Sequence, residues 1–238
     1  MKQKFIIFLV MGVIAFAKAG AQQVEKGFEM MEVLKIADTY KQAGSLSFDM
    51  YYTYTDSAHL GSVLESMNGS TKISNGRYWT KMDSAVESLQ GYQYNITLYY
   101  QDSTIVLGDR QDMNKVLSMP MLDTMFQQSD VDSLKITEYD DSTRKLTVFF
   151  GSYSAYRQYT MLYDKNSYLI RSINYNIRNT AEGATATTGL ITLTLSDYSF
   201  GPVDESVFRE DKYVYKQNGQ YFTKPGYTNF QLQVNTIN

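Results

Sequence analysis

The sequence predicts an α+β protein built on a curved antiparallel β-sheet, with one helix before the sheet. Many short segments alternate apolar and polar residues between turn residues, which is typical of antiparallel strands with one buried face. Residues 22–43 instead carry apolar residues at helical spacing. Residues 110–132 show no strand alternation and are expected to form short helices.

The first 21 residues have the three parts of a secretion signal. Lys2 and Lys4 give a basic start, residues 5–17 an apolar run, and Ala19-Gly20-Ala21 a cleavage site of small residues. The apolar run is short for a membrane span, and a chain without cysteine offers no thiol for lipid attachment or disulfides. We therefore expect an exported, periplasmic protein of the bacterial envelope that does not span the membrane, with residues 22–238 as a single domain.

The mature chain is expected to be acidic. Of the 22 Lys and Arg residues, three precede Gln22, which leaves 19 against 25 Asp and Glu and a net charge of −6. An acidic chain without a basic stripe is not expected to bind nucleic acid. The 21 Tyr and only three Pro favour a β-rich globular protein over a disordered one.

The segment 189–208 is expected to be the closing strand of the sheet. Its apolar residues alternate with polar ones up to Asp197, where the apolar phase shifts by one residue, and this shift predicts a bulge or bend. Gly201-Pro202 ends the strand, and Phe208 is expected to return to the same core. The alternating residues are Ile191, Leu193 and Leu195 on one side, and Thr192, Thr194 and Ser196 on the other.

The other elements are expected in series along the chain. The helix 22–43 ends near Gly44, and the pairs Asn75-Gly76 and Asn218-Gly219 predict tight hairpin turns. The expected strands are 46–54, 63–73, 77–82, 92–100, 104–107, 135–139, 145–150, 157–163, 168–177, 213–215 and 220–222, with a last partly alternating piece at 226–237. The last of these segments form a C-terminal hairpin extension.

Residues 110–132 are rich in methionine, and Pro120 divides them into one or two short helices. Methionine side chains can repack around apolar ligands of varied shape, so this segment is a candidate cover over an apolar cavity. Gap-filling within the core explains the same composition equally well. The candidate ligand-binding residues of this segment are Met113, Leu117, Met119, Met121, Leu122, Met125 and Phe126.

The chain lacks the residue patterns of catalytic and metal sites. His59 is the single histidine and lies in a Tyr- and Ser-rich turn, and there is no Gly-x-Ser-x-Gly motif. Zinc and copper sites need Cys and His ligands that this chain does not have. The adjacent carboxylates Asp140-Asp141 and Asp204-Glu205 fall at expected turns, where solvation explains them better than calcium. We therefore expect no catalytic residue, metal or cofactor.

Arg171 is an exception among the strand residues. It shares strand parity with Ile173 and Tyr175, and a charge on an apolar face is costly unless it is paired or lies at the mouth of a cavity. A sheet-edge arginine whose side chain reaches solvent is the favoured interpretation, and a place at a cavity mouth is the alternative.

Four segments resemble the periplasmic lipoprotein carrier family, which has the LolA/LolB fold. They are Gly76-Arg77-Tyr78-Trp79-Thr80-Lys81, the hairpin 102–107, the strand pair 161–173 and the closing segment 193–208, so the resemblance covers about residues 46–208. The resemblance implies a half-barrel with helices over its concave face and acyl chains between them, and it adds Trp79 and Arg171 to the candidate ligand-binding residues. Met82-Asp83 stand where that family often has Arg-Pro, so the role of that arginine is not carried over.

These observations favour a non-catalytic periplasmic carrier or sensor that binds the acyl chains of a lipid or lipoprotein. The alternative is an envelope protein that binds another protein and fills its core with its own side chains. An enzyme ranks third, because the sequence assembles no nucleophile or metal site.

Overall fold

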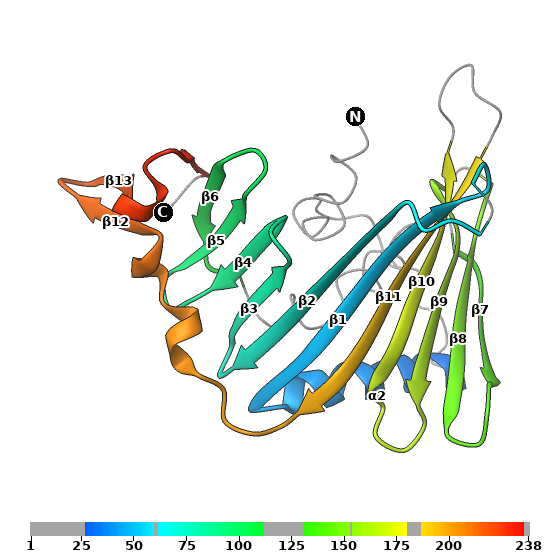
Figure 1. The fold of residues 1–238 in the computed structure, drawn as a ribbon. Helices are drawn as coiled ribbons and strands as arrows, with labels where there is room; N and C mark the ends of the chain where they lie inside the picture. Colours follow the sequence, from blue (N-terminus) through cyan, green and yellow to red (C-terminus); the bar gives the residue numbers. More distant parts are fainter. Residues whose placement is uncertain (1–26, 60, 112–130, 153, 180–186, 236–238) are drawn as a thin grey trace. The chain divides into compact units, whose positions relative to one another are not determined.

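The computed structural model describes residues 27–59, 61–111, 131–152, 154–179 and 187–235 (Figure 1). The expected secretion signal and residues 112–130 lie outside these ranges, and so do seven of the candidate ligand-binding residues, Met113 to Phe126. Within them the structure has one α-helix, α2 (Phe28–Gln42), and three 3-10 helices, η1 (Glu205–Phe208), η2 (Glu210–Lys212) and η3 (Pro225–Tyr227). No described helix is long and apolar enough to cross a membrane.

The described strands form one large sheet of twelve strands and a separate two-stranded hairpin, β12–β13. The order in the large sheet is β14-β6-β5-β4-β3-β2-β1-β11-β10-β9-β8-β7. Neighbours are antiparallel from β2 to β6 and from β7 to β11, whereas β14 runs parallel to β6. The strands are β1 (Ser45–Asp56), β2 (Glu65–Ser74), β3 (Arg77–Met82), β4 (Val86–Gln90), β5 (Tyr94–Tyr99), β6 (Thr104–Asp109), β7 (Val131–Glu138), β8 (Thr143–Phe150), β9 (Tyr156–Asp164), β10 (Ile170–Asn179), β11 (Thr187–Ser199), β12 (Val214–Gln217), β13 (Gln220–Thr223) and β14 (Gln231–Val234).

The prediction of a large, mostly antiparallel sheet after one helix is confirmed. Asn75 and Gly76 have φ angles of 48° and 75°, and Asn218 and Gly219 have 51° and 82°, as tight hairpin turns require. Asp197 has a φ of 52°, so the backbone of β11 leaves the extended conformation where the apolar phase shifts.

Other expectations were wrong in detail. The strand β4 was not predicted, and all five of its residues are buried, so it shows no alternation between a wet and a dry face. Strand β7 begins at Val131, before the expected start at 135. The short helices expected within residues 110–132 fall almost wholly on residues 112–130, which lie outside the described residues, so that expectation stays a prediction; the described helices are α2 and three 3-10 turns.

The chain divides into two compact units, and the expected single domain stays a prediction. The first unit comprises residues 1–42, 50–67 and 116–196, and the second comprises 43–49, 68–115 and 197–238.

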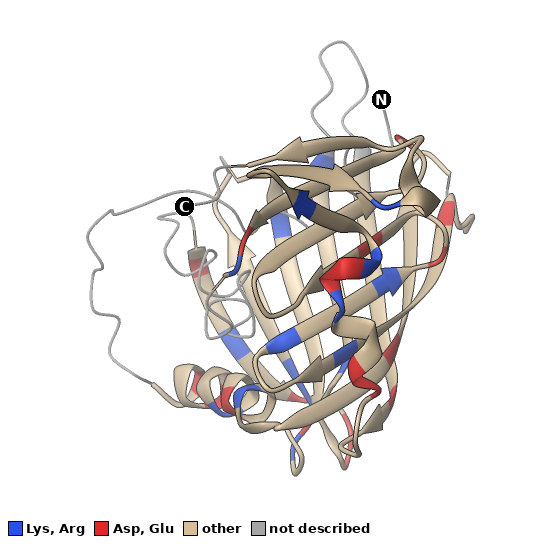
Figure 2. Cartoon of the chain, turned by 90° about the vertical axis from the view of Figure 1, so that its left-hand side faces the viewer, with Lys and Arg blue, Asp and Glu red and all other residues tan. Residues whose placement is uncertain are grey.

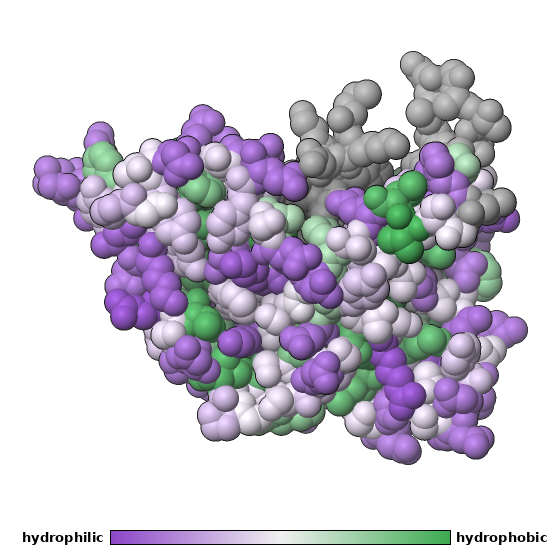
Figure 3. Space-filling view, in the orientation of Figure 1, coloured by the Kyte–Doolittle hydropathy of each residue, from purple (hydrophilic) through white to green (hydrophobic). Residues whose placement is uncertain are grey.

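In the first unit, strands β8 to β11 have one apolar face. Two cross-strand rows form it, Val148–Tyr159–Tyr175–Ile191 and Leu146–Met161–Ile173–Leu193. The opposite face, seen in front of α2 in Figure 1, is mixed in hydropathy, with hydrophobic side chains in separate patches (Figure 3). Helix α2 crosses one end of these strands and buries Val33, Ile36, Ala37 and Tyr40. The amphipathic pattern of the helix therefore matches the one-sided sheet.

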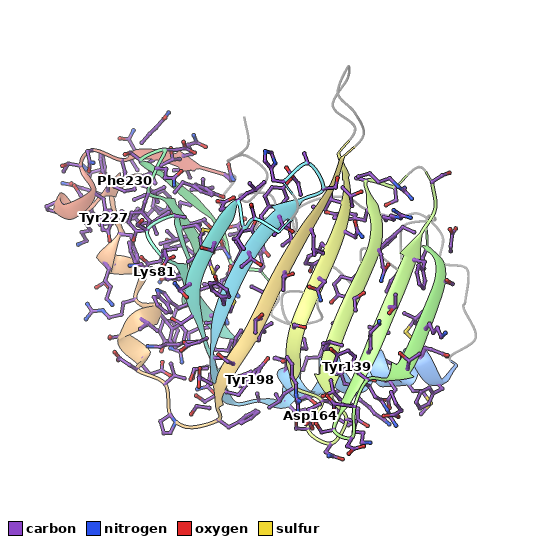
Figure 4. All side chains as sticks on the ribbon, turned by 45° about the vertical axis from the view of Figure 1, so that its right-hand side comes forward. Lys81, Tyr139, Asp164, Tyr198, Tyr227 and Phe230 are labelled. Carbon is purple, nitrogen blue, oxygen red and sulfur yellow. The ribbon has the colours of Figure 1, made fainter. Side chains whose placement is uncertain are left out.

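In the second unit, one face of β4 to β6 forms a separate hydrophobic core. Leu89, Ile96, Leu98, Ile105 and Leu107 pack with Tyr213 and Val214 of the C-terminal segment. Tyr227, Phe230 and Leu232 of the same segment pack against this core while partly buried, and Figure 4 labels the first two. The C-terminal extension is thus integrated into the second unit.

Candidate functional site

The candidate ligand-binding surface of the described residues is the apolar face of β8 to β11, which lies in the first unit. Here "apolar face" means Leu146, Val148, Tyr159, Met161, Ile173, Tyr175, Ile177, Ile191 and Leu193. Val148 and Met161 are 0% exposed, and Tyr159 is 2% exposed. Period-two alternation places these side chains on one side because successive residues of a strand point to opposite faces.

Aromatic contacts continue the apolar face along β8 to β10. The ring centroids of Tyr159 and Tyr175 lie 5.1 Å apart, those of Tyr156 and Tyr175 6.4 Å, and those of Phe150 and Tyr156 6.0 Å. Burial raises the pKa of the Tyr159 and Tyr175 hydroxyls, so both stay neutral at physiological pH. The surface is therefore uncharged and suited to hydrocarbon.

A buried carboxylate, Glu32, fastens α2 to this sheet. Its side chain is 1% exposed and pairs through Oε2 with Arg144 Nη1 at 2.8 Å and through Oε1 with Lys35 Nζ at 2.9 Å. The Tyr163 hydroxyl donates to the same Oε2 at 3.0 Å. Burial alone raises the pKa of Glu32, but the hydrogen bonds from Lys35, Arg144 and Tyr163 outweigh it, and the pKa lies below its ordinary value.

Arg144 connects this carboxylate to the end of the sheet that carries the β7–β8 and β9–β10 turns. Its Nε also donates to Glu138 at 2.9 Å, and its guanidinium lies 5.6 Å from the ring of Phe28 on α2. The two turns lie at the same end of the strands, as Tyr139 and Asp164 show in Figure 4. Ion pairs and a cation–π contact therefore hold the N-terminal half of α2. The outward side of this half carries the exposed apolar residues Phe28, Met31 and Leu34.

Arg171 lies at this same end and not within the apolar face. The pairing of β9 with β10 is irregular between Ile170 and Ser172, so the arginine is released from the regular pleat. Its guanidinium pairs with Asp164 at 2.7 Å and its side chain is 48% exposed. The side chain reaches solvent, but the expected sheet-edge position is wrong, because β10 lies between β9 and β11 in the sheet. A role of Arg171 in ligand binding stays a prediction.

Trp79 belongs to the second unit, where it helps to satisfy a second buried carboxylate. Its Nε1 donates to Glu87 Oε1 at 2.7 Å, and the Tyr213 hydroxyl donates to the same oxygen at 2.6 Å. Tyr100 donates to the other oxygen, and Lys81 Nζ lies 4.0 Å from it. Burial alone raises the pKa of Glu87, but the bonds from Tyr100, Tyr213 and Trp79 lower it below its ordinary value.

The described residues contain no arrangement that indicates metal chemistry. No group of three or more His, Cys, Asp or Glu side chains in these ranges could hold a metal ion. His59 lies exposed in a turn, where its Nδ1 is 2.8 Å from Asp56 Oδ1. This is a local turn contact of the kind that Asp residues commonly make.

Sequence analysis missed Glu32 and Glu87. Both carry a usable signal, because each charged residue falls in an otherwise buried pattern. Glu32 lies on the buried stripe of α2 beside Val33 and Ile36, and Glu87 shares strand parity with Leu89. A charge at such a position predicts a partner, although not which one.

Comparison with known proteins gives likenesses among solved structures. No protein-family description matches the chain, and no curated protein matches it. A LolA superfamily protein from Nitrosomonas europaea is 7% identical, with a TM-score of 0.35 over 77% of this chain and 98% of that one. A DUF1329 family protein from Desulfovibrio piger is 9% identical, with a TM-score of 0.38 over 76% and 97%. An uncharacterized conserved protein from Thermus thermophilus is 10% identical, with a TM-score of 0.43 over 85% and 98%. The LolA superfamily suggested by the sequence is thus among the structures that this chain resembles, and the likenesses carry no information on ligand or partner.

Proposed function

We propose that the protein is a non-catalytic carrier or sensor of the bacterial envelope that binds the acyl chains of a lipid or lipoprotein on the apolar face. The observation that supports this most is that strands β8 to β11 carry two in-register rows of uncharged side chains on one face. These side chains are branched, aromatic or methionine. Each buried CH₂ group contributes about 0.8 kcal/mol, so about ten methylenes contribute roughly 8 kcal/mol before the costs of binding.

The acyl chain would lie between α2 and the apolar face. The side chains that α2 buries include Val33, Ile36 and Ala37, which are short or branched. We expect such side chains to impose little selectivity on the shape of an acyl chain. The charged contacts of Glu32 hold the helix at one end of the strands. Methionine at position 161, at the centre of the face, can change rotamer to admit a chain.

A second candidate function is supported by the burial of the same residues. Val148, Leu146 and Met161 are 0% exposed, as residues are in a core that the protein fills with its own side chains. In that case the protein is an interaction module of the envelope. The exposed side of α2, with Phe28, Met31 and Leu34, would then be a surface for another protein.

Filling the apolar face distinguishes the two functions. In Ile191→Phe the larger ring would occupy the space of an acyl chain, so the affinity for a fluorescent fatty acid should fall at least about tenfold while the melting temperature changes little. Thr192→Ser, on the opposite face of the same strand, is the matched control and should bind like the parent. In a self-filled core the parent shows no affinity, and overpacking by Ile191→Phe costs about 1–3 kcal/mol of stability.

A further inference from the structure

The large sheet ends at β14, and no strand pairs with the outer edge of β14 in the part of the chain that the structure describes. The backbone N–H groups of Gln231 and Asn235 donate to carbonyl oxygens of β6 or the residue before it, at 2.8 Å each. Because the backbone groups of successive residues point to opposite sides of a strand, those of Leu232 and Val234 point away from β6. Each of these two residues therefore presents an N–H and a C=O group at the free edge.

The apolar side of the sheet that carries the Leu89 core ends on the same strand. In register, Leu107 of β6 lies beside Val234, and Ile105 lies beside Leu232. Leu107 and Ile105 are 0% exposed, whereas Val234 at the edge is 47% exposed. Among the large exposed hydrophobic side chains that the structure describes in the second unit, Val234 is the only aliphatic one. The apolar face and the backbone hydrogen bonds of the sheet therefore both stop at β14.

The strand at the other end of the sheet order, β7, is protected against pairing with another chain. Its register with β8 shifts between Val131 and Ser133, and the strand carries the charged residues Asp132, Lys135 and Glu138. Irregular pairing and charged side chains are two of the ways in which proteins prevent edge strands from pairing with other chains. Strand β14 has neither, because its residues are uncharged and its pairing with β6 is regular. Of these two edges, β14 is thus the one that is open to a further strand.

The sequence of β14 is complementary to itself in one antiparallel register. Around a two-fold axis at Gln233, Leu232 of one copy lies opposite Val234 of a second copy, and Gln231 lies opposite Asn235. This register brings the outward N–H and C=O groups of Leu232 against those of Val234, so each of these groups gains a hydrogen bond. It also pairs apolar side chains on one face of the sheet and amide side chains on the other. A shift by one residue loses both matches at once.

We propose that the free edge of β14 is the interface of a homodimer, in which a second copy of this chain adds its own β14 in the antiparallel register. A second copy fits this edge because the strand matches itself in hydrogen bonds and in apolar side chains, and carries no charge that would oppose its own. Residues 231–235 of each copy form the pairing, so the interface falls below the about 1,200 Å² of stable complexes and the dimer is weak. This interface goes beyond the proposed acyl-chain binding and does not depend on it.

Sedimentation equilibrium of the full mature chain, between about 10 μM and about 1 mM, tests the interface. The average mass of the parent should rise with concentration from that of the monomer towards twice that value. Val234→Lys should weaken this association at least about tenfold, because a lysine on an edge strand opposes pairing with another strand. Its melting temperature should change little, because Val234 is exposed. Val63→Lys, at an exposed valine of the first unit outside any strand, is the matched control and should associate like the parent.

A second variant separates the backbone hydrogen bonds from the effect of an added charge. Val234→Pro removes the N–H group that points outward and leaves the bonds that Gln231 and Asn235 make towards β6. Proline is tolerated in an edge strand where the N–H side faces solvent, so the fold should be retained. This variant should weaken association as strongly as Val234→Lys. Hydrogen exchange at the Leu232 and Val234 amides of the parent should also slow as the concentration rises.

Three outcomes would overturn the β14 interface. The first is a parent that stays monomeric up to about 1 mM, including one whose edge binds only a strand of another protein. The second is equal association of the parent, Val234→Lys and Val234→Pro, which would mean that the copies meet through another surface. The third is a parent dimer in which the Leu232 and Val234 amides exchange as fast as in the monomer. Fluorescent fatty acid binding, measured on the same samples, reports on the proposed function separately.

Discussion

At the scale of single residues, each unit contains one buried carboxylate that accepts hydrogen bonds from several side chains. Glu32 receives donors from Arg144, Lys35 and Tyr163 in the first unit. Glu87 receives them from Trp79, Tyr100 and Tyr213 in the second. A buried charge is tolerated only when its lone pairs are satisfied, and both carboxylates meet this condition. Their hydrogen bonds therefore connect the elements of each unit.

Glu32→Gln should destabilise the protein in a pH-dependent way. The folded pKa of Glu32 is lowered, so its stabilisation is fully present above the ordinary Glu pKa of about 4.3 and is lost as the pH falls through the lower folded value. At pH 7 the loss should be roughly 1.5–3 kcal/mol, as for hydrogen bonds to a charged group. Melting curves from pH 7 to pH 3 should show the gap between variant and parent closing.

Asp38→Asn, at an exposed position of the same helix, is the matched control and should change stability by less than about 0.5 kcal/mol. A gap between Glu32→Gln and the parent that stays constant down to pH 3 would contradict this role of the charge. The loss would then come from shape alone.

At the scale of elements, the C-terminal segment is the part that the sequence predicted least. Its hairpin turn was predicted, but the parallel pairing of β14 with β6 depends on a contact between residues 231–234 and 104–107, far apart in the chain. No local pattern encodes such a pairing. The aromatic contacts of Phe230 with Tyr100 and of Tyr221 with Tyr94, with ring centroids 6.0 Å and 5.5 Å apart, connect this segment to the strands of the second unit.

The same distinction holds for the other elements. Alternation in the sequence predicted β1 and β5, and the Asn75-Gly76 turn predicted β3. Strand β4 carries Glu87, Ser88 and Gln90 in buried positions and so gives no such pattern. The candidate site divides likewise. The apolar face follows from alternation, but the pairing of Glu32 with Arg144 joins residues 112 positions apart and needs the fold.

Tyr213→Phe should loosen the C-terminal segment. It removes one of the donors of Glu87 and leaves a buried carboxylate oxygen with fewer partners, which should cost roughly 1.5–3 kcal/mol. Hydrogen exchange should then be faster at the amides of Lys224 and Gln231, which bond to Tyr213 and Ser103. Equal exchange in variant and parent would show that the aromatic packing alone holds the segment.

At the scale of the whole molecule, charge and hydropathy are the properties that bear on what the protein could bind. Basic and acidic residues are interspersed on the face shown in Figure 2, without a continuous basic stripe. The full sequence has 25 acidic against 22 basic residues, and the expectation that nucleic acid is not a partner stays a prediction. The apolar face in the first unit is the surface on which the proposed function rests.

The most direct test of the central claim is native mass spectrometry of the protein purified from a bacterial envelope fraction without detergent exchange. The account predicts a chain that begins at Gln22 and carries additional mass that dissociates on activation as an acyl-containing lipid or lipoprotein fragment. The Ile191→Phe variant, prepared in the same way, should lose most of this additional mass, while Thr192→Ser keeps it. A parent protein that is detected only at the mass of the bare polypeptide would contradict acyl-chain binding and favour the interaction module.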